Sequence, residues 1–325
     1  MSRTEPDVGV IIPAYNAERT IGRAVSSALR EPETCEVIVV IDGATDGTAR
    51  AARAADDGSG RLKIIELKVS GGPAAARNRA LAESRAAWVC PLDSDDYFLA
   101  GRLGRMRAET GYCDFVADDL LRVLEGRHEA PAHPMIGQRM NLPMCLGFED
   151  FVLANISRPN LPRAELGFLK PLMRRSFLDT HGLAYDETLR LGEDFILYAT
   201  ALALGARFKV LPPCGYVAVE RADSISGSHG AADLRRLVEA SRAMEQLRLT
   251  PDELHALREH RAHVSAKLAL RDFLDAKRQA GLVRATAILA RMPGAAPFVV
   301  TTIATDVIKR NRGRHAGSVQ RPTAA

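Results

Sequence analysis

The first hundred residues alternate between short apolar runs and segments with helical spacing, and no other feature of the chain restricts its fold as strongly. The helical segments, such as Ala17–Leu29, place alanine and larger apolar residues on one face. The apolar runs, which predict strands buried on both faces, are Val8–Ile12, Glu36–Ile41, Leu62–Leu67 and Trp88–Leu92. Because strand–helix–strand units require right-handed crossovers, we predict an α/β fold with a mixed, mostly parallel sheet and helices on both faces.

The rest of the chain is divided by the regularity of its pattern. Residues 101–230 have weaker signals, with a Pro- and Gly-rich stretch at His128–Pro143 that predicts a loop. Residues 231–296 are strongly helical, with breaks near Thr250-Pro251 and Ala280-Gly281. Residues 297–325 begin with an apolar stretch shorter than the about 20 residues that span a bilayer, followed by a basic tail. We predict one domain over residues 1–230, divided near residue 100, then a helical extension and an end expected to be disordered.

The net charge of +4 is unevenly distributed along the chain. Residues 233–325 carry 17 Lys and Arg against 9 Asp and Glu, whereas the preceding residues carry 27 against 31. A basic end on an acidic body predicts contact with an anionic membrane surface, and a solvated helical face is the alternative. Nucleic acid is not an expected partner, because this end has almost no aromatic side chains for stacking and no recognised binding motif.

The five cysteines lie far apart in the sequence, and no two form a Cys-x-x-Cys pair. This pattern predicts reduced thiols in the cytosol and argues against a disulfide framework or a structural zinc site. The polar N-terminus lacks the apolar core of a signal peptide, so a cytoplasmic location is expected.

Acidic side chains follow the fourth predicted strand, in the segment Asp93-Ser94-Asp95-Asp96. In an extended chain, residues two apart point the same way, so Asp93 and Asp95 are expected to face one ligand together. Such a pair of carboxylates requires a cation, and Mg²⁺ or Mn²⁺ bound by carboxylates and substrate phosphates fits these oxygen ligands. The alternative is an Asx-type turn before the next helix. Ligands of parallel sheets bind at the carboxyl ends of strands, so this position favours a ligand site.

Two further segments follow neighbouring strands at the same edge. Asp42 ends the second strand, where a carboxylate can accept a hydrogen bond from a ribose hydroxyl or a base N–H. Gly71-Gly72-Pro73 opens a helix that carries Arg77, an arrangement that suits a phosphate bound by free backbone N–H groups and a guanidinium group. The segment is neither Gly-x-Gly-x-x-Gly nor a Lys-bearing phosphate loop, so nicotinamide binding and ordinary ATPase chemistry are not supported.

A pair of acids, Glu193-Asp194, opens a predicted helix about a hundred residues after the Asp segment. A carboxylate at this place can act as a general base if it lies within hydrogen-bond reach of an acceptor hydroxyl. The alternative is that both acids only complement the positive end of the helix dipole.

Five segments in this order together resemble the inverting nucleotide-sugar glycosyltransferases of family 2, particularly glucosyltransferases of exopolysaccharide synthesis. The segments are Ile11-Ile-Pro-Ala-Tyr-Asn-Ala, Asp42-Gly-Ala-Thr-Asp-Gly-Thr, Gly72-Pro-Ala-Ala-Ala-Arg-Asn-Arg-Ala, Pro91-Leu-Asp-Ser-Asp-Asp and Leu191-Gly-Glu-Asp. The resemblance covers roughly residues 8–228. It implies the GT-A fold, with a Rossmann-like nucleotide-binding sheet.

The resemblance implies which residues bind the donor nucleotide. Pro13, Ala14 and Tyr15 would line the nucleotide pocket, and Asp42 would lie at the uracil. Arg77 would contact the base or the diphosphate.

The resemblance also implies metal-binding and catalytic roles for the acids. Asp93 and Ser94 would lie near the ribose, with Asp93 also near the metal, and Asp95 would hold the divalent ion that bridges the diphosphate. Asp194 would be the catalytic base, with Glu193 beside it supporting the acceptor or the base.

One segment departs from the pattern of the family. Many relatives carry a His in a short basic motif before a Ser-Ile-Ser-like segment, and here Arg221 is near that position. We expect Arg221 or His229 to contact the donor diphosphate after loop closure, with His229 as a further metal ligand.

These implications predict a metal-dependent inverting enzyme that transfers a hexose, expected to be glucose, from a UDP-sugar to a glycan hydroxyl. The expected acceptor is a lipid-linked exopolysaccharide unit, reached at the cytoplasmic face of a membrane that the segment from Pro297 to Arg314 contacts. A helix pair for dimerisation or core covering is the alternative for that end. The alternative functions are a sugar nucleotidyltransferase, which would need a Gly-rich basic loop after the first strand, and a non-catalytic nucleotide-sugar-binding scaffold.

Overall fold

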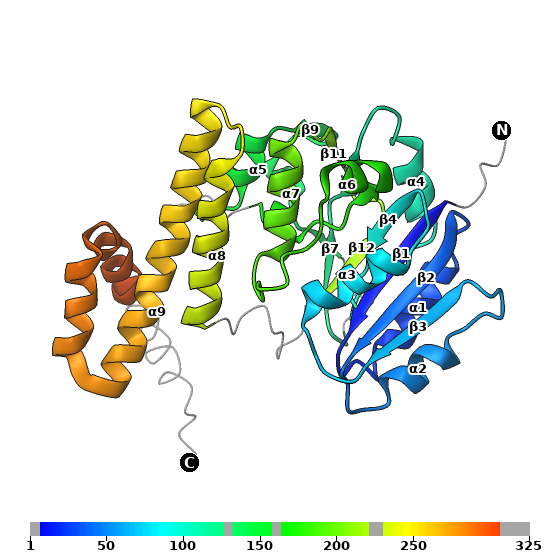
Figure 1. Cartoon of the computed structure of the whole chain (residues 1–325), viewed down its shortest axis with the longest axis horizontal. Coiled ribbons are helices and arrows are strands. Elements are labelled where there is room, and N and C mark those ends of the chain that lie inside the picture. The colour runs from blue at the N-terminus through cyan, green and yellow to red at the C-terminus, as the bar shows by residue number, and fades with distance from the viewer. Residues whose placement is uncertain (1–6, 127–131, 158–163, 221–229, 306–325) are drawn as a thin grey trace, which may run out of the picture.

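The computed structural model describes residues 7–126, 132–157, 164–220 and 230–305. At its centre is an eight-stranded mixed sheet with the strand order β3-β2-β1-β4-β10-β6-β11-β9 (Figure 1). Its strands are β1 (Val8–Ala14), β2 (Thr34–Asp42), β3 (Leu62–Leu67), β4 (Trp88–Pro91), β6 (Phe115–Asp118), β9 (Met144–Leu146), β10 (Leu172–Arg174) and β11 (Phe208–Leu211). The first four strands are parallel, whereas β10 runs antiparallel to both β4 and β6.

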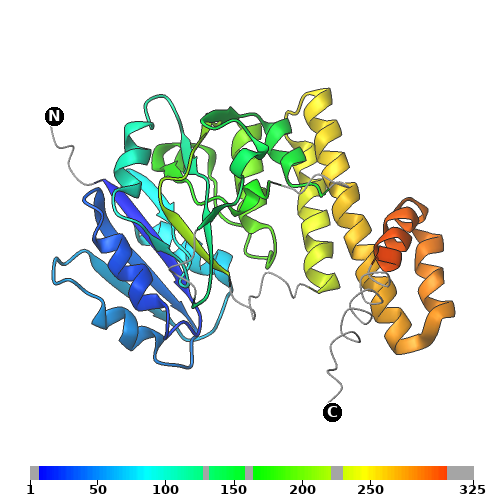
Figure 2. The same cartoon turned by 180° about the vertical axis from the view of Figure 1, so that it is seen from behind.

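Helices cover both faces of the parallel half, which explains why the inner strands β1, β2 and β4 are mostly apolar. The edge strand β3 exposes Lys63 and Glu66, so the prediction that it is buried on both faces is wrong. Helices α1 (Ile21–Leu29) and α2 (Thr48–Ala54) lie on one face, and α3 (Pro73–Glu83) lies on the other (Figures 1 and 2). Helix α1 buries Ile21, Ala24 and Val25 completely. Helix α3 begins with Pro73, whose missing N–H costs nothing at a helix start.

A second, smaller sheet contains β5 (Tyr97–Phe98), β12 (Tyr216–Glu220), β7 (Leu121–Leu124) and β8 (His133–Pro134). Strand β5 follows the Asp93–Asp96 segment directly and pairs with β12. Helix α4 (Arg102–Ala108) comes next, and its Arg102 is 2.7 Å from Asp118 in a fully buried ion pair. This pair attaches α4 to the end of β6.

The remaining helices follow later in the chain. They are α5 (Phe148–Ala154), α6 (Arg175–His181), α7 (Glu193–Ala203), α8 (Ala231–Ala243) and α9 (Pro251–Arg291), with short 3₁₀ turns at Gly137–Arg139, Leu166–Phe168, Met244–Gln246 and Pro293–Ala295. Helices α6 and α7 pack on β6 through contacts of Phe177 and Tyr198 with Phe115. Helix α9 begins with a capping box, in which Thr250 and Glu253 each bond the other's backbone N–H. A further helical segment covers residues 296–305.

The C-terminal helices take part in two hydrophobic cores. Helix α8 and the first part of α9 belong to the core of the sheet, through Leu237 and Leu257, and His260 stacks on Phe195 of α7 with 4.2 Å between ring centroids. A smaller core further along α9 includes Phe273 and Val299, so residues 296–305 pack against α9. Residues on both sides of the predicted boundary at residue 230 therefore share one hydrophobic core. The division into domains stays a prediction.

The predicted fold class is confirmed, including the helices on both faces and the C-terminal helical region. The predicted break at Gly281 is also present, since this residue has a φ of 82° and a ψ of 175° inside α9. The expectation of a loop over His128–Pro143 is only partly correct, because the described part contains β8 and a 3₁₀ turn. Among the described helices, none combines the length and the apolar character needed to span a membrane.

Candidate functional site

The candidate site lies at the carboxyl ends of β1 and β4. The strand order reverses at this place, because β2 and β3 extend the sheet on one side of β1 and β4 lies on the other. A crevice outside the carboxyl ends at such a reversal is where open α/β sheets bind ligands. Strand β1 ends at Ala14, and Asp93 follows two residues after the end of β4.

Five charged side chains meet beside Asp93, and we call them the charged cluster: Arg77, Asp93, Lys170, Glu193 and Asp194. Arg77 Nη2 is 2.8 Å from Asp93 Oδ1, and its Nη1 is 2.9 Å from Glu193 Oε1. Lys170 Nζ is 2.7 Å from Asp194 Oδ2 and 3.1 Å from Asp93 Oδ2. The cluster thus joins α3, the end of β4, the approach to β10 and the start of α7.

Burial of the charged cluster is possible because each of its two cations pairs with carboxylates, and three acids against two bases leave one negative charge. Arg77 and Lys170 are each 4% exposed, and Asp194 is 7% exposed. Burial alone would raise the pKa of Asp93, but Lys170 and Arg77 hold that pKa well below its ordinary value. Burial would likewise lower the pKa of Arg77 and of Lys170, but the charges of Asp194 and Asp93 raise both. Asp93, Arg77 and Lys170 are therefore charged at neutral pH.

Local structure explains how α7 delivers its two acids. Gly192 precedes the helix with a φ of 77°, a left-handed conformation that glycine adopts without strain. A Cβ at this position would lie 2.9 Å from Leu237 Cδ1, so α8 packs directly against the start of α7. The positive end of the helix dipole also favours acids in the first turn, where Glu193 and Asp194 lie.

The structure brings Arg77, Asp93, Glu193 and Asp194 together, as the sequence predicts, while their chemical roles stay predictions. The details differ for Arg77. Both terminal nitrogens of its guanidinium group already bind carboxylates, so this arrangement does not support the expectation that they face a phosphate or the base. Arg77 instead holds the acids of α7 beside Asp93.

The Asp93–Asp96 segment is a turn, because Asp96 N donates a hydrogen bond to Asp93 O at 3.1 Å. The expectation of an extended chain is therefore wrong, and Ser94 lies inside the turn. That Asp93 and Asp95 face one ligand stays a prediction. Asp96 is bound within the protein, since its carboxylate accepts hydrogen bonds from Val219 N and the Tyr216 hydroxyl, both at 2.8 Å. Burial raises the pKa of Asp96 well above its ordinary value, and the charges of Asp93 and Asp95 add to this effect.

Asp42 organises the loop before α3. Its Oδ1 accepts from Gly71 N, and its Oδ2 accepts from Gly72 N and the Ser70 hydroxyl, at 2.7 to 2.8 Å. The expectation that the Gly71 and Gly72 N–H groups are free for a phosphate is therefore wrong. Gly72 has a φ of 95°, and a Cβ there would lie 2.8 Å from the Arg190 guanidinium group, so this loop approaches an exposed arginine closely.

The segment after β1 presents an aromatic ring at the same edge. Ala14 is buried and Pro13 is half-buried, whereas Tyr15 is 53% exposed. Asn16 has a φ of 47°, and its side-chain oxygen accepts a hydrogen bond from Thr45 N, which ties this segment to the loop after β2. Tyr15 is therefore exposed at this edge, and its role in the nucleotide pocket stays a prediction.

Sequence reasoning missed Lys170. It is the only charged residue in the apolar run Leu166–Met173, and an isolated lysine among apolar residues indicates a buried charge with a partner. Strand pairing identifies the partner region, because Met173 of β10 faces Val89 of β4, and continuing this antiparallel register places Lys170 beside the residues that follow β4.

The surroundings of Asp93 and Asp95 show how well these two predicted metal ligands fit a divalent ion. Among the described residues, no group of three or more His, Cys, Asp or Glu side chains is arranged to hold a metal ion. Asp93 and Asp95 fit a Mg²⁺ or Mn²⁺ ion bound by one or two carboxylates and a diphosphate. Each carboxylate oxygen of Asp93 already faces a cation of the protein, which makes Asp93 a less favourable metal ligand. Arg221 and His229 lie outside the described residues.

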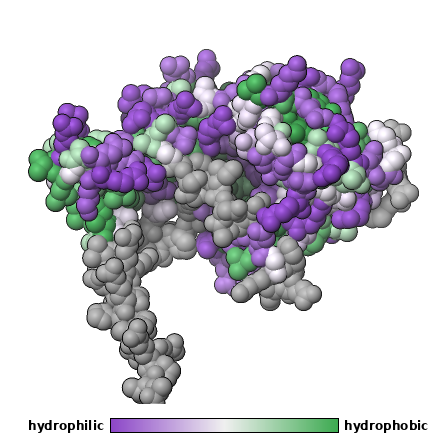
Figure 3. Space-filling view, turned by 90° about the horizontal axis from the view of Figure 1, so that it is seen from below, coloured by the Kyte–Doolittle hydropathy of each residue, from purple (hydrophilic) through white to green (hydrophobic). Residues whose placement is uncertain are grey.

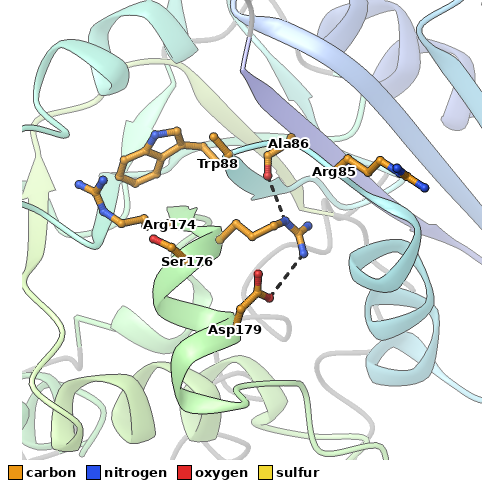
Figure 4. Close-up of a pocket in the computed structure, with 8 residues that line it drawn as sticks. Arg85, Ala86, Trp88, Arg174, Ser176 and Asp179 are labelled. Atoms are coloured by element: carbon orange, nitrogen blue, oxygen red, sulfur yellow. Dashed lines mark hydrogen bonds and ion pairs between the residues drawn. The ribbon is translucent and has the colours of Figure 1, made fainter.

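A separate pocket lies at the amino end of β4 and is lined by residues that include Arg85, Trp88 and Arg174 (Figure 4). Its Arg175 donates to Ala86 O at 3.0 Å and lies 3.9 Å from Asp179. No predicted site residue lines this pocket, and it lies at the opposite end of β4 from Asp93. It is therefore not the candidate site.

Comparisons with known proteins found a matching family model and similar sequences. A family model described as "Glycosyl transferase family 2" matches residues 9–154. The chain is 49% identical to the succinoglycan biosynthesis protein ExoU of Rhizobium meliloti, over 96% of this chain and 90% of that protein. It is 39% identical to the succinoglycan biosynthesis protein ExoO of the same organism, over 68% of this chain and 63% of that protein.

Solved structures are similar in fold. The crystal structure of S. aureus TarS 1-349 in complex with UDP-GlcNAc is 20% identical, with a TM-score of 0.61 over 88% of this chain and 92% of that one. The mannosyltransferase PcManGT from Pyrobaculum calidifontis, in complex with GDP-Man and Mn²⁺, is 20% identical, with a TM-score of 0.57 over 96% of this chain and 83% of that one. At such identities the likeness concerns the fold.

Proposed function

This chain belongs to glycosyl transferase family 2, and we propose that it transfers a hexose, with inversion, from a UDP-sugar to a hydroxyl group of a glycan. The proposed acceptor is a lipid-linked intermediate of exopolysaccharide synthesis, and glucose is the proposed hexose. The names of the relatives support a role in polysaccharide synthesis, since two of them are succinoglycan biosynthesis proteins.

One observation carries the proposal: acids from distant parts of the chain meet at the carboxyl edge of the sheet. Asp93, at the end of β4, and Asp194, at the start of α7, both bind the Lys170 ammonium group. The family relationship argues against a sugar nucleotidyltransferase. A non-catalytic scaffold would have no need of this charged cluster beside the nucleotide edge.

In the proposed reaction, Asp194 accepts the proton of the acceptor hydroxyl while the oxygen attacks the anomeric carbon of the donor. The bond between this carbon and the UDP phosphate oxygen breaks from the opposite side, which inverts the configuration. Asp194 Oδ1 is buried and accepts no hydrogen bond from the described residues, and Arg77 Nη1 lies 3.8 Å from it. This oxygen is therefore suited to take up the proton.

We propose that Tyr15 stacks on the uracil and that Asp42 orders the donor side by holding the loop of Gly71 and Gly72. Asp95 would hold a divalent metal, which neutralises the charge of the diphosphate leaving group when bound. The mannosyltransferase structure with GDP-Man and Mn²⁺ supports metal use in this fold.

We also propose a peripheral contact with an anionic membrane at the cytoplasmic face. The apolar segment predicted for this role packs Val299 into the smaller core, so we assign the contact to the break in α9. There Leu282 is 58% exposed and Val283 is 84% exposed, and Lys277, Arg278 and Arg284 are close in sequence. Apolar side chains are visible on the surface at this end of the molecule (Figure 3). Exposed apolar side chains among basic ones suit an anionic interface.

A donor screen tests the enzyme assignment. Purified protein is incubated with UDP-glucose, UDP-galactose or UDP-GlcNAc and a lipid-linked glycan, and UDP release is measured with and without EDTA. We expect release with one donor, dependent on the acceptor and abolished by EDTA. UDP binding without release from any donor would support the scaffold, and pyrophosphate release from UTP and a sugar phosphate would support the nucleotidyltransferase.

Vesicle flotation tests the membrane contact. We expect the protein to float with anionic vesicles and not with zwitterionic ones, and the Leu282→Asp/Val283→Asp variant to lose this binding. Val69→Asp is the matched control, because Val69 is 80% exposed but lies in the loop before α3. Equal flotation of both variants would reject the contact at the α9 break.

A further inference from the structure

We propose that Lys170 is a positioning residue for the transfer reaction: its ammonium group holds Oδ2 of Asp194 and leaves Oδ1 to accept the acceptor's proton. This inference rests on the proposed function and adds a residue outside the five sequence motifs. Lys170 does not itself contact the reacting atoms in this proposal, since it acts through Asp194.

The two oxygens of Asp194 have different environments. Oδ2 lies 2.7 Å from Lys170 Nζ, a charge-assisted hydrogen bond. Oδ1 is buried and has no hydrogen-bond donor among the described residues. A buried carboxylate oxygen without a donor is costly, so its persistence points to a ligand that supplies one. A hydroxyl group of the acceptor supplies such a donor.

The backbone around Lys170 is firmly anchored, which limits where its ammonium group can lie. Lys170 O accepts a hydrogen bond from Arg102 Nη2 at 2.7 Å, and Arg102 is itself paired with Asp118. The preceding carbonyl, Leu169 O, accepts one from the Tyr198 hydroxyl at 3.1 Å. The lysine therefore starts from a fixed point in the core and ends at the carboxylate of Asp194.

Lys170 also connects the two sides of the site. Its ammonium group lies 3.1 Å from Asp93 Oδ2. Arg77 binds Asp93 through the other oxygen, Oδ1, and also binds Glu193. Without a cation between them, Asp93 and Asp194 would repel each other. Arg77 makes its hydrogen bonds to Asp93 and Glu193, so Lys170 is the residue whose loss would release Asp194.

The experiment compares Lys170→Gln, which removes the charge but keeps an N–H donor, with Lys170→Arg, which keeps the charge. We expect the Gln variant to lower kcat about 10- to 100-fold, as expected for a displaced catalytic group. The KM for the donor and the Kd for UDP should stay within about twofold, because Arg77 still holds Asp93 and because Asp42 and Tyr15 are untouched. The Arg variant should recover a substantial part of kcat. Lys209→Gln is the control, since Lys209 pairs with Glu109 and does not belong to the charged cluster.

A double-variant measurement separates positioning from a general structural role. In an Asp194→Asn background, Lys170→Gln should lower residual transfer less than about twofold, because both changes remove the same function. A full additional loss would overturn the proposal, as would wild-type kcat in the single Gln variant. Loss of UDP binding together with kcat, without recovery by Arg, would also overturn it.

Two controls keep the result decisive. If the Gln variant does not fold, Lys170→Arg decides: transfer close to wild type supports the proposal, and a folded variant without transfer overturns it. If the wild-type protein transfers no sugar from any donor, the proposed function fails, which is distinguishable from a wild-type enzyme that is insensitive to Lys170.

Discussion

Asparagine at position 194 would keep the shape of the Asp194 side chain and remove its ability to take up a proton. Its amide oxygen can still accept the hydrogen bond from Lys170 Nζ, now 2.7 Å from Oδ2, and Lys170 keeps its contact with Asp93 at 3.1 Å. The folded state therefore keeps this hydrogen bond but loses the negative charge beside Lys170 and Arg77, and we expect the free energy of unfolding to fall by about 1 to 3 kcal/mol.

The catalytic effect of the same change should be much larger. A positioned general base contributes about 10²- to 10⁴-fold to a reaction rate. Its loss corresponds to an activation barrier higher by about 3 to 5 kcal/mol. We therefore expect kcat to fall at least about 100-fold, while UDP binding, which involves the other side of the site, stays nearly unchanged.

The assay measures UDP release at saturating donor and acceptor, UDP affinity by calorimetry, and the melting temperature. Asp150→Asn is the matched control, because Asp150 is also an acid in the first turn of a helix, α5, but is exposed and outside the charged cluster. That control should lose only the helix-dipole contribution, about 0.3 to 1 kcal/mol of stability, and no activity. If Asp194→Asn binds UDP normally and transfers sugar at more than about a tenth of the wild-type rate, the reasoning behind the base is refuted.

Three further changes test the structure around the site. Gly192→Ala should destabilise the protein by about 1 to 3 kcal/mol, because the new Cβ would lie 2.9 Å from Leu237. Gly205→Ala should cost less, because Gly205 has a similar φ but open space around it. Equal melting temperatures of the two variants would contradict the packing of α8 on α7. Arg102→Met should cost about 3 to 5 kcal/mol by leaving Asp118 buried and unpaired, against at most about 1 kcal/mol for Lys209→Met at the surface, as measured by urea unfolding. Burial raises the pKa of Asp96 in the folded state, so the contribution of Asp96 to stability is complete below about pH 4 and is lost as the pH rises through its folded-state pKa. The Asp96→Asn variant should not show this loss. Parallel curves of stability against pH for the variant and the wild type, from about pH 4 to 8, would disprove this expectation.

Much of the fold follows from local patterns in the sequence. The buried strands are short apolar runs, and the parallel arrangement follows from the helical segments between them. The break of α9 at Gly281 and the start of this helix at Thr250 are also local, because one residue's backbone freedom and one capping pair decide them. Such features depend on near neighbours, so the sequence is sufficient to predict them.

The charged cluster was predictable only in part. Asp93, Glu193 and Asp194 carry motif signals, but their partners depend on contacts between distant segments. The antiparallel pairing of β10 with β4 places Lys170 beside Asp93, and this pairing joins residues about eighty positions apart. The hydrogen bonds from Gly71 and Gly72 to Asp42 were likewise not predictable from the sequence, because they depend on how closely two loops approach each other.

The order of residues alone determined the class of sheet and the acids that reach its carboxyl edge. The folded chain decided which cation faces which carboxylate, and it left one buried oxygen of Asp194 without a donor from the described residues. The physical reason is range: helix and strand formation depend on neighbouring side chains, whereas ion pairing within a core depends on a few tenths of an ångström between segments that only the complete packing brings together.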